Sequence, residues 1–221
     1  MEVYSIPRKK KSFLSRLSLT TWLIIVNVFV FIVVSILWSV NFLSQKAIAI
    51  SPYYILNGQY LWTFVSSMFM HAGFFHLFVN MLSLFFVGSL IEKILGRKKY
   101  FAFYLVAGIF ASLLFVLSGL FFPADLYSFA VGASGALFGL IGLLMFLTPN
   151  LKVYLMFIPI PIKMKYAAPG MLVVLWLISL AGNIPLGNFA HLGGLVVGIV
   201  YGIYLKRKYP KKTKSISRHF S

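Results

Sequence analysis

The chain contains no cysteine, and only 3 of its 221 residues are acidic. Without cysteine it cannot form a disulfide or use a thiolate as a nucleophile or metal ligand. Charged residues make up 10% of the sequence, against about 25% in ordinary soluble domains. Hydrophobic residues make up 61%, so too few charged groups remain to cover the surface of a soluble domain. This composition excludes the soluble and disordered classes and predicts a polytopic membrane protein.

Six apolar segments fit an all-α membrane bundle, because a spanning helix needs roughly 20 apolar residues. We expect them at about 22–40, 75–91, 100–122, 134–147, 168–180 and 189–205. The fourth segment is short because Pro149 limits it, so its outer end is expected to start well below the membrane surface. The long first connection, 41–74, carries a single charge and is expected to lie in the membrane interface.

The net charge of +17 is typical of a nucleic-acid-binding protein, but its distribution indicates a membrane topology instead. If the N-terminus is cytoplasmic, six spans place nineteen of the twenty lysines and arginines inside and only Lys46 outside. We therefore expect a multi-pass cell-membrane protein with both termini in the cytoplasm. Its expected parts are a basic arm (1–21), a membrane domain (22–205) and a basic, solvated tail (206–221). The basic segments are expected to contact anionic membrane lipid and no nucleic acid.

Polar side chains inside membrane segments are costly unless they are paired, so those present are candidate functional groups. His76 and Asn80 lie at the start of the second segment, Ser134 at the start of the fourth, and His191 at the start of the sixth. These three segments run in the same direction, from outside to inside. All four side chains are therefore expected toward the outer leaflet and at a similar depth.

Glycines recur along the fourth and sixth segments at spacings that permit close contact between membrane helices. They are Gly132, Gly135, Gly139 and Gly142, and then Gly194, Gly198 and Gly202. If these two glycine faces meet, Ser134 and His191 come within hydrogen-bonding distance. A serine beside a histidine base is the minimal activated nucleophile, and His76, Asn80 and a backbone N–H could stabilise an oxyanion.

Three motifs, in this order and spacing, resemble the rhomboid family of intramembrane serine proteases. They are His71-Ala72-Gly73-Phe74-Phe75-His76 with Asn80, Gly132-Ala133-Ser134-Gly135, and Ala190-His191-Leu192-Gly193-Gly194 with Gly198. Glu92 and Gly96 fit the same pattern, and the resemblance covers roughly residues 60–205. It implies a six-transmembrane-helix rhomboid-like bundle with a long interfacial first loop.

The resemblance also implies a role for each motif residue. Ser134 would be the nucleophile and His191 the general base, while His76, Asn80 and the Ser134 N–H would form the oxyanion hole. His71 would belong to the hydrogen-bonded framework of the first loop. No cofactor or metal is implied, and the substrates would be transmembrane proteins, with single-pass proteins expected first.

Two positions depart from the family's pattern. Phe138 stands where the family often has a tyrosine that packs on the histidine, so it keeps the ring and loses the hydroxyl. Trp62 is followed by Thr63, where the family often has an arginine that anchors the first loop. Neither change removes the expected catalytic chemistry.

The sequence leaves other interpretations open. The chain could be a catalytically silent rhomboid-like protein that binds membrane clients. It could also be a small transporter or metal channel, with His71, His76 and His191 as a trio of ligands. Asp125 is a candidate third member of a triad, although a dyad is favoured. Glu92 is expected to pair with basic neighbours at the cytoplasmic end.

Overall fold

The computed structural model describes residues 17–154, 159–182 and 186–220, and the regular secondary structure of this part is helical apart from one short pair of strands and an isolated bridge. Its elements, in chain order, are α2 (Leu19–Ser39), η1 (Gln45–Ala47), α3 (Pro52–Leu56), α4 (Thr63–Ser66), η2 (Ser67–Phe69), α5 (Phe74–Ser83), the π-turn η3 (Leu84–Gly88), α6 (Ser89–Leu95), α7 (Arg97–Ser118), α8 (Pro123–Leu126), α9 (Ser134–Leu147), β1 (Lys152–Val153), β2 (Ile162–Lys163), α10 (Met164–Gly182), α11 (Asn188–Lys208) and α12 (Pro210–His219).

Five helices of the described chain are long and apolar enough to span a membrane, and α9 is a shorter apolar helix. One of the five is continuous over Phe74–Leu95, where α5, η3 and α6 follow one another. The predicted all-α polytopic bundle is confirmed, although the expected boundaries differ. α7 ends at Ser118 rather than at residue 122, because the chain turns there and Pro123 starts α8. α10 begins at Met164, since its first turn is polar and hydropathy alone does not detect it.

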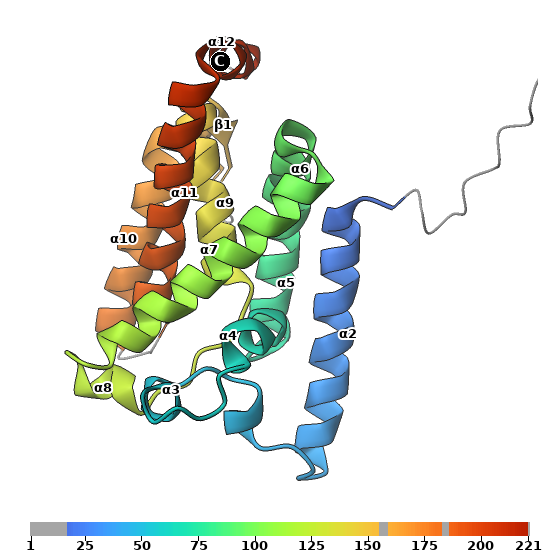
Figure 1. The fold of residues 1–221 in the computed structure, drawn as a ribbon, viewed down its shortest axis with the longest axis vertical. Helices are drawn as coiled ribbons and strands as arrows, with labels where there is room; N and C mark the ends of the chain where they lie inside the picture. The colour runs from blue at the N-terminus through green and yellow to red at the C-terminus, as the bar shows by residue number, and fades with distance from the viewer. Residues whose placement is uncertain (1–16, 155–158, 183–185, 221) are drawn as a thin grey trace, which may run out of the picture.

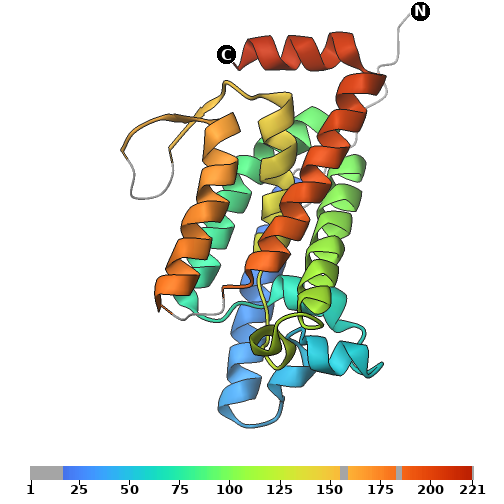
Figure 2. The same ribbon diagram turned by 90° about the vertical axis from the view of Figure 1, so that its left-hand side faces the viewer.

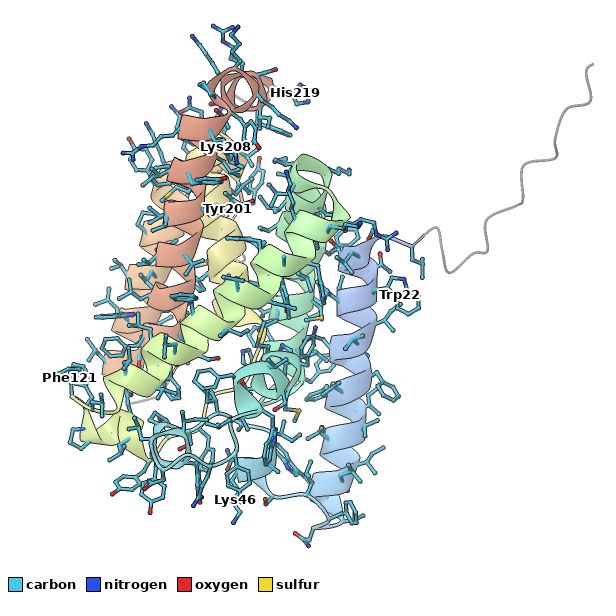
Figure 3. All side chains as sticks on the ribbon, viewed as in Figure 1. Trp22, Lys46, Phe121, Tyr201, Lys208 and His219 are labelled. Carbon is cyan, nitrogen blue, oxygen red and sulfur yellow. The ribbon has the colours of Figure 1, made fainter. Side chains whose placement is uncertain are left out.

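The two ends of the bundle differ in charge (Figure 1). The cationic end holds the α6–α7 turn, the β1–β2 hairpin, the last turn of α11, and α12, and every described lysine and arginine except Lys46 lies in or beside these segments. Figure 3 shows Lys208 and His219 at this end and Lys46 at the opposite one, which we call the loop end. This separation agrees with the distribution of charge expected from the sequence.

The expected solvated tail is largely a helix. α12 follows α11 directly and lies across the cationic end, roughly perpendicular to the spans (Figure 2). Thr213 is its buried residue, and most of its other side chains, including His219, are exposed. The expected exposure therefore holds for most of the described tail, and its helical structure is a finding that the expectations from the sequence did not address. The sequence does carry a helix-start signal, Pro210 at the first helical position of a cationic amphipathic stretch.

The centre of the bundle is α9, which is buried along most of its length between α7 and α11. The contact between α9 and α11 depends on glycine. A Cβ added at Gly194 would overlap the carbonyl oxygen of Gly135, and one added at Gly198 would overlap that of Gly139. The two glycine faces therefore meet, as their spacing predicted, and the two backbones approach more closely than any larger residue permits.

The first span is held at the cationic end by a buried carboxylate. Glu92 accepts hydrogen bonds from the backbone N–H groups of Leu19 and Thr20 and from the Thr20 hydroxyl, each at 2.8 Å. These N–H groups belong to the first turn of α2, where the helix dipole also favours a negative charge. The expected basic neighbour is present, since Arg97 Nε lies 3.9 Å from Glu92, but the helix start supplies the shorter contacts.

Replacing Gly198 by alanine is expected to destabilise the bundle by about 1–3 kcal/mol, because the new methyl group must push α9 and α11 apart. Gly170→Ala on α10 is the matched control, since a Cβ there meets nothing within 4 Å. It should be neutral, or stabilising by up to about 1 kcal/mol through the lost backbone freedom of glycine. Thermal unfolding of both variants in the same detergent checks this, and equal shifts in Tm would contradict the packing described.

Glu92→Gln should destabilise the protein by about 1.5–3 kcal/mol, because it replaces charge-assisted hydrogen bonds at the start of α2 by weaker neutral ones. Arg97→Gln should cost less than about 1 kcal/mol, since its ion pair is long and the arginine side chain is 53% exposed. Tm values for the two variants test this ranking. If Arg97→Gln lowers Tm as much as Glu92→Gln, Glu92 stabilises the protein mainly through the ion pair and the ranking is wrong.

Candidate functional site: a serine–histidine pair inside the bundle

The first loop holds the turn that precedes α9. Ile50 and Ala130 exchange two backbone hydrogen bonds, of 3.0 and 2.8 Å. Two residues further on, the Gly132 N–H donates to the Ser67 carbonyl at 2.8 Å. The Ala133 N–H then donates to His71 Nε2 at 3.5 Å. The backbone of residues 130–133 is thus fixed by the first loop immediately before Ser134.

His71 is fully buried in this loop. Its pKa is lowered to about 3, mainly because burial disfavours the charged ring and also because His76 lies nearby. His71 therefore stays neutral and keeps the lone pair with which it accepts the Ala133 N–H. This contact agrees with the framework role that the resemblance implied for His71. Sequence reasoning did not identify Ser67 or Ile50, because both act through the backbone and leave no side-chain signal.

The first loop is anchored locally, without an arginine. The Trp62 indole N–H donates to the Ala47 carbonyl at 2.9 Å, and the Thr63 hydroxyl donates to the Tyr60 carbonyl at 2.7 Å. Thr63 is buried although Trp62 is exposed. The threonine at this position therefore closes a turn of its own loop.

Ser134 and His191 form a hydrogen bond, with 2.9 Å between Ser134 Oγ and His191 Nε2. Ser134 is the first residue of α9, which begins about midway along the bundle in Figure 1. His191 lies in the first turn of α11, where its backbone N–H is bonded to the Gly187 carbonyl. The serine is half-buried and the histidine buried. The glycine contact of α9 with α11 brings these two side chains together from positions 57 residues apart.

Apart from Ser134, the His191 ring contacts an aromatic ring and has no carboxylate partner among the described residues. Phe138, one turn beyond Ser134, stacks on the imidazole with 4.6 Å between centroids and 25° between planes. His191 Nδ1 is buried and has no hydrogen-bond partner among the described residues. Asp125 instead accepts from the Ser118 hydroxyl at 2.7 Å. The site therefore contains a pair, and Asp125 as its third member was the wrong alternative.

His76 lies against the turn that carries Ser134. A Cβ built on Gly132 would lie 2.8 Å from His76 Cε1, 2.9 Å from His76 Nε2 and 3.6 Å from Ser134 Oγ. Gly132 has a φ of +126°, so only glycine fits here on both counts. The Ala72 N–H donates to His76 Nδ1 at 3.4 Å, which leaves the proton of the neutral ring on Nε2. This N–H is the one that lies beside Gly132.

Asn80 lies one turn further along the same helix. Its Nδ2 donates to the His76 carbonyl at 2.8 Å, while its buried Oδ1 has no partner in the described part of the chain. No hydrogen bond joins Asn80 to Ser134 or His191 within those residues. The structure therefore brings Ser134, His191 and His76 together, and the hydrogen bond of Asn80 is with the backbone of His76.

The histidines do not form a metal centre. His71 and His76 pack edge to face with 5.2 Å between ring centroids, and His191 is bonded to Ser134. Among the residues described, no group of three histidine or acidic side chains is arranged to hold a metal ion. The proposed trio of metal ligands is therefore not supported by this geometry.

The fold and site together define a class: a polytopic membrane protein with a serine hydroxyl bonded to a histidine within the bundle. A family model of the Rhomboid domain matches residues 58–208, which is more than half of the chain. The protein belongs to the rhomboid family.

Curated relatives carry rhomboid names. "RHOMBOID-like protein 1" of Arabidopsis thaliana is 37% identical over 161 residues, covering 72% of this chain and 38% of the relative. "Rhomboid protein 1, mitochondrial" of Saccharomyces cerevisiae is 32% identical over 178 residues, covering 74% and 48%. "Inactive RHOMBOID-like protein 8" of Arabidopsis thaliana is 34% identical over 139 residues, covering 62% and 36%. The chain thus spans less than half the length of these relatives.

Gly132→Ala should lower Tm more than Gly58→Ala, by the equivalent of at least about 1 kcal/mol. Both positions have positive φ values, of +126° and +73°, so alanine strains the backbone at each. Only the Gly132 variant also forces a methyl group into the His76 ring, since a Cβ at Gly58 meets nothing within 4 Å. Thermal unfolding of the two variants measures the difference, and equal losses would contradict the close approach of His76.

Proposed function

We propose that the protein is an intramembrane serine endopeptidase that cleaves peptide bonds in or near the transmembrane segments of other membrane proteins. The observation that carries this proposal is the 2.9 Å hydrogen bond between Ser134 Oγ and His191 Nε2 inside a rhomboid-family bundle. Burying a serine–histidine pair in a membrane protein is costly, and a nucleophile with its base is the chemistry that explains it.

In the first step, Ser134 Oγ attacks the scissile carbonyl carbon while His191 Nε2 takes the hydroxyl proton. For Nε2 to accept, the neutral ring must carry its own proton on Nδ1. The resulting imidazolium has no carboxylate beside it among the described residues, but its face lies on Phe138. The π-electrons of an aromatic ring attract a cation, so the phenylalanine both orients the ring and stabilises its charged form. The missing tyrosine hydroxyl is not needed for either effect.

The negative charge that develops on the carbonyl oxygen requires hydrogen-bond donors fixed in place beforehand. His76 Nε2 and Ser134 Oγ both lie within 4 Å of the Cβ position of Gly132, so the His76 Nε2–H is the donor that the geometry supports best. The backbone N–H of Ser134, at the start of α9, is a second candidate because the first N–H groups of a helix have no partner within it. Asn80 Nδ2 uses one N–H to bind the His76 carbonyl, so its second N–H remains to donate.

His191 then returns its proton to the leaving amine, and the acyl-enzyme ester on Ser134 forms. Water attacks this ester with His191 again accepting a proton, which releases the product acid and restores the serine. A helical substrate must first unwind locally, because its carbonyl groups are engaged in the hydrogen bonds of the helix. Substrates with helix-breaking residues near the cleaved bond are therefore favoured.

The location of the site follows from the charge of the bundle. We place the cationic end in the cytoplasm, in accordance with the excess of lysine and arginine on that side of membrane proteins. The short α9 then puts Ser134 toward the outer leaflet, and the loop end supplies the water for hydrolysis. Both termini and the basic segments that flank the spans lie on the cytoplasmic side in this arrangement.

A second candidate is a catalytically silent rhomboid-like protein that binds membrane clients. One relative is named as inactive, so family membership alone does not decide between the two. The hydrogen-bonded Ser134–His191 pair supports the protease, since a client-binding protein has no use for an activated hydroxyl. The transporter alternative would need a polar pathway, whereas the polar groups here are gathered around one serine.

The proposal predicts that a fluorophosphonate probe labels the purified protein and that a panel of single-pass membrane proteins contains a substrate that it cleaves. Ser134→Ala should abolish labelling and reduce cleavage to background, because Ser134 carries the hydroxyl that is bonded to His191. Ser89→Ala on α6 is the control for the same chemical change away from the site, and it should behave as the wild type.

Cleavage by the Ser134→Ala variant would refute the protease assignment. A wild-type protein that is neither labelled nor active, yet retains a membrane client through purification, would favour the client-binding alternative. His191→Ala alone does not separate the candidates, since a metal-dependent or client-binding site could lose function as well.

A further inference from the structure

A long apolar groove runs between α7 and α11 on the outside of the bundle. Its volume is about 980 Å³, and its lining extends from Lys99 to Leu117 on α7 and from Leu192 to Tyr204 on α11. The two helices touch at Gly193, where an added Cβ would lie 3.0 Å from Leu114 Cβ. Figure 1 shows α7 crossing α11 obliquely, so the helices diverge toward the cationic end. The groove is therefore a consequence of the tilt of α7.

The lining changes character along the groove. Most of its length is aliphatic or phenylalanine, and Val106, Phe110, Val196 and Val200 are each 46–61% exposed. Nearer the cationic end, Tyr201 stacks on Phe103 with 4.9 Å between centroids and on Tyr204 with 5.9 Å. The aliphatic and phenylalanine side chains of the apolar part offer water no hydrogen-bonding groups, so hydrocarbon fills that part in a membrane.

Cations lie at the end of the groove where the aromatic residues stop. Lys99 lines this end directly, and Lys208 Nζ donates to the Tyr204 hydroxyl at 2.7 Å. Figure 3 shows Lys208 at the cationic end, beyond Tyr201. The tyrosine oxygen accepts from the lysine, so its own proton is available to another acceptor. Neither lysine has a carboxylate partner, because the ion pair within the described residues is that of Glu92 with Arg97, and Asp125 is at the opposite end.

We propose that this groove binds an anionic phospholipid from the leaflet at the cationic end. Its acyl chains lie along the apolar part, and its phosphate is held by Lys99, Lys208 and the Tyr204 hydroxyl. Basic pockets between membrane helices on the cytoplasmic side are suited to anionic headgroups. A second copy of this chain fits less well, because it would bring its own lysines to the same place and carries +17 itself.

This inference concerns binding and does not depend on the proposed protease activity. The test therefore measures lipid retention by native mass spectrometry of the purified full chain in detergent. The probes are phosphatidylglycerol and phosphatidylcholine with identical acyl chains. The wild type should bind one phosphatidylglycerol at least fivefold more tightly than phosphatidylcholine. Equal affinities for the two lipids would overturn the proposal.

Single charge changes locate the headgroup. Lys99→Gln and Lys208→Gln should each weaken phosphatidylglycerol binding about fivefold and leave phosphatidylcholine unchanged. Lys98→Gln is the matched control, because this neighbouring lysine is not among the residues that line the groove. If Lys98→Gln weakens binding as much as Lys99→Gln, the attraction is a diffuse surface effect and the specific site is wrong.

Filling the groove locates the acyl chains. Val200→Trp should remove the tightly bound phosphatidylglycerol, whereas Val174→Trp, at a comparably exposed valine on α10, should retain it. Because the chain has no cysteine, Val200→Cys also reports on a second copy through disulfide cross-linking. Efficient cross-linking that persists in excess phosphatidylglycerol, or retention of the lipid by Val200→Trp, would overturn the proposal.

Discussion

The contact between the backbones of α9 and α11 is the constraint on which the site depends. Membrane helices gain little from burying apolar surface against one another, so close packing must supply their attraction. Here Gly194 and Gly198 let α11 lie directly on the carbonyl groups of Gly135 and Gly139. At this separation, the first turns of the two helices place a serine hydroxyl within hydrogen-bonding distance of an imidazole. A larger residue at Gly194 or Gly198 would push the two helices apart and separate Ser134 from His191, although neither reactive side chain is itself changed.

Buried polar groups have different surroundings at Glu92 and around Ser134. At the cationic end, both carboxylate oxygens of Glu92 are occupied by the start of α2, which makes that corner a rigid anchor. Around Ser134, several buried polar atoms have no partner within the described residues: Nδ1 of His71, Nδ1 of His191 and Oδ1 of Asn80. Unpartnered polar atoms are rare in protein interiors and call for an explanation. Groups that await a substrate carbonyl, a transferred proton or a water molecule provide one.

Much of this arrangement could be predicted from the sequence, because membrane insertion restricts a chain to few solutions. Apolar length located the six helices, the positions of lysine and arginine separated the two ends, and glycine spacing identified which helix faces meet. The backbone contacts could not be predicted, since Ser67 and Ile50 act through N–H and C=O groups that every residue carries. The helical tail was missed because charge dominates its composition. Helix spacing placed Asn80 on the same face as His76, but it could not show that one amide N–H of Asn80 is bonded to the His76 carbonyl.

The central claim is that Ser134 is a nucleophile whose reacting oxyanion is received by donors already in place. The most direct measurement is the experimental structure of the protein after reaction with a fluorophosphonate. The account predicts phosphorus bonded to Ser134 Oγ, with the phosphoryl oxygen about 3 Å from His76 Nε2 and within reach of the Ser134 N–H. An adduct on another residue, or a phosphoryl oxygen that points away from His76, would contradict it.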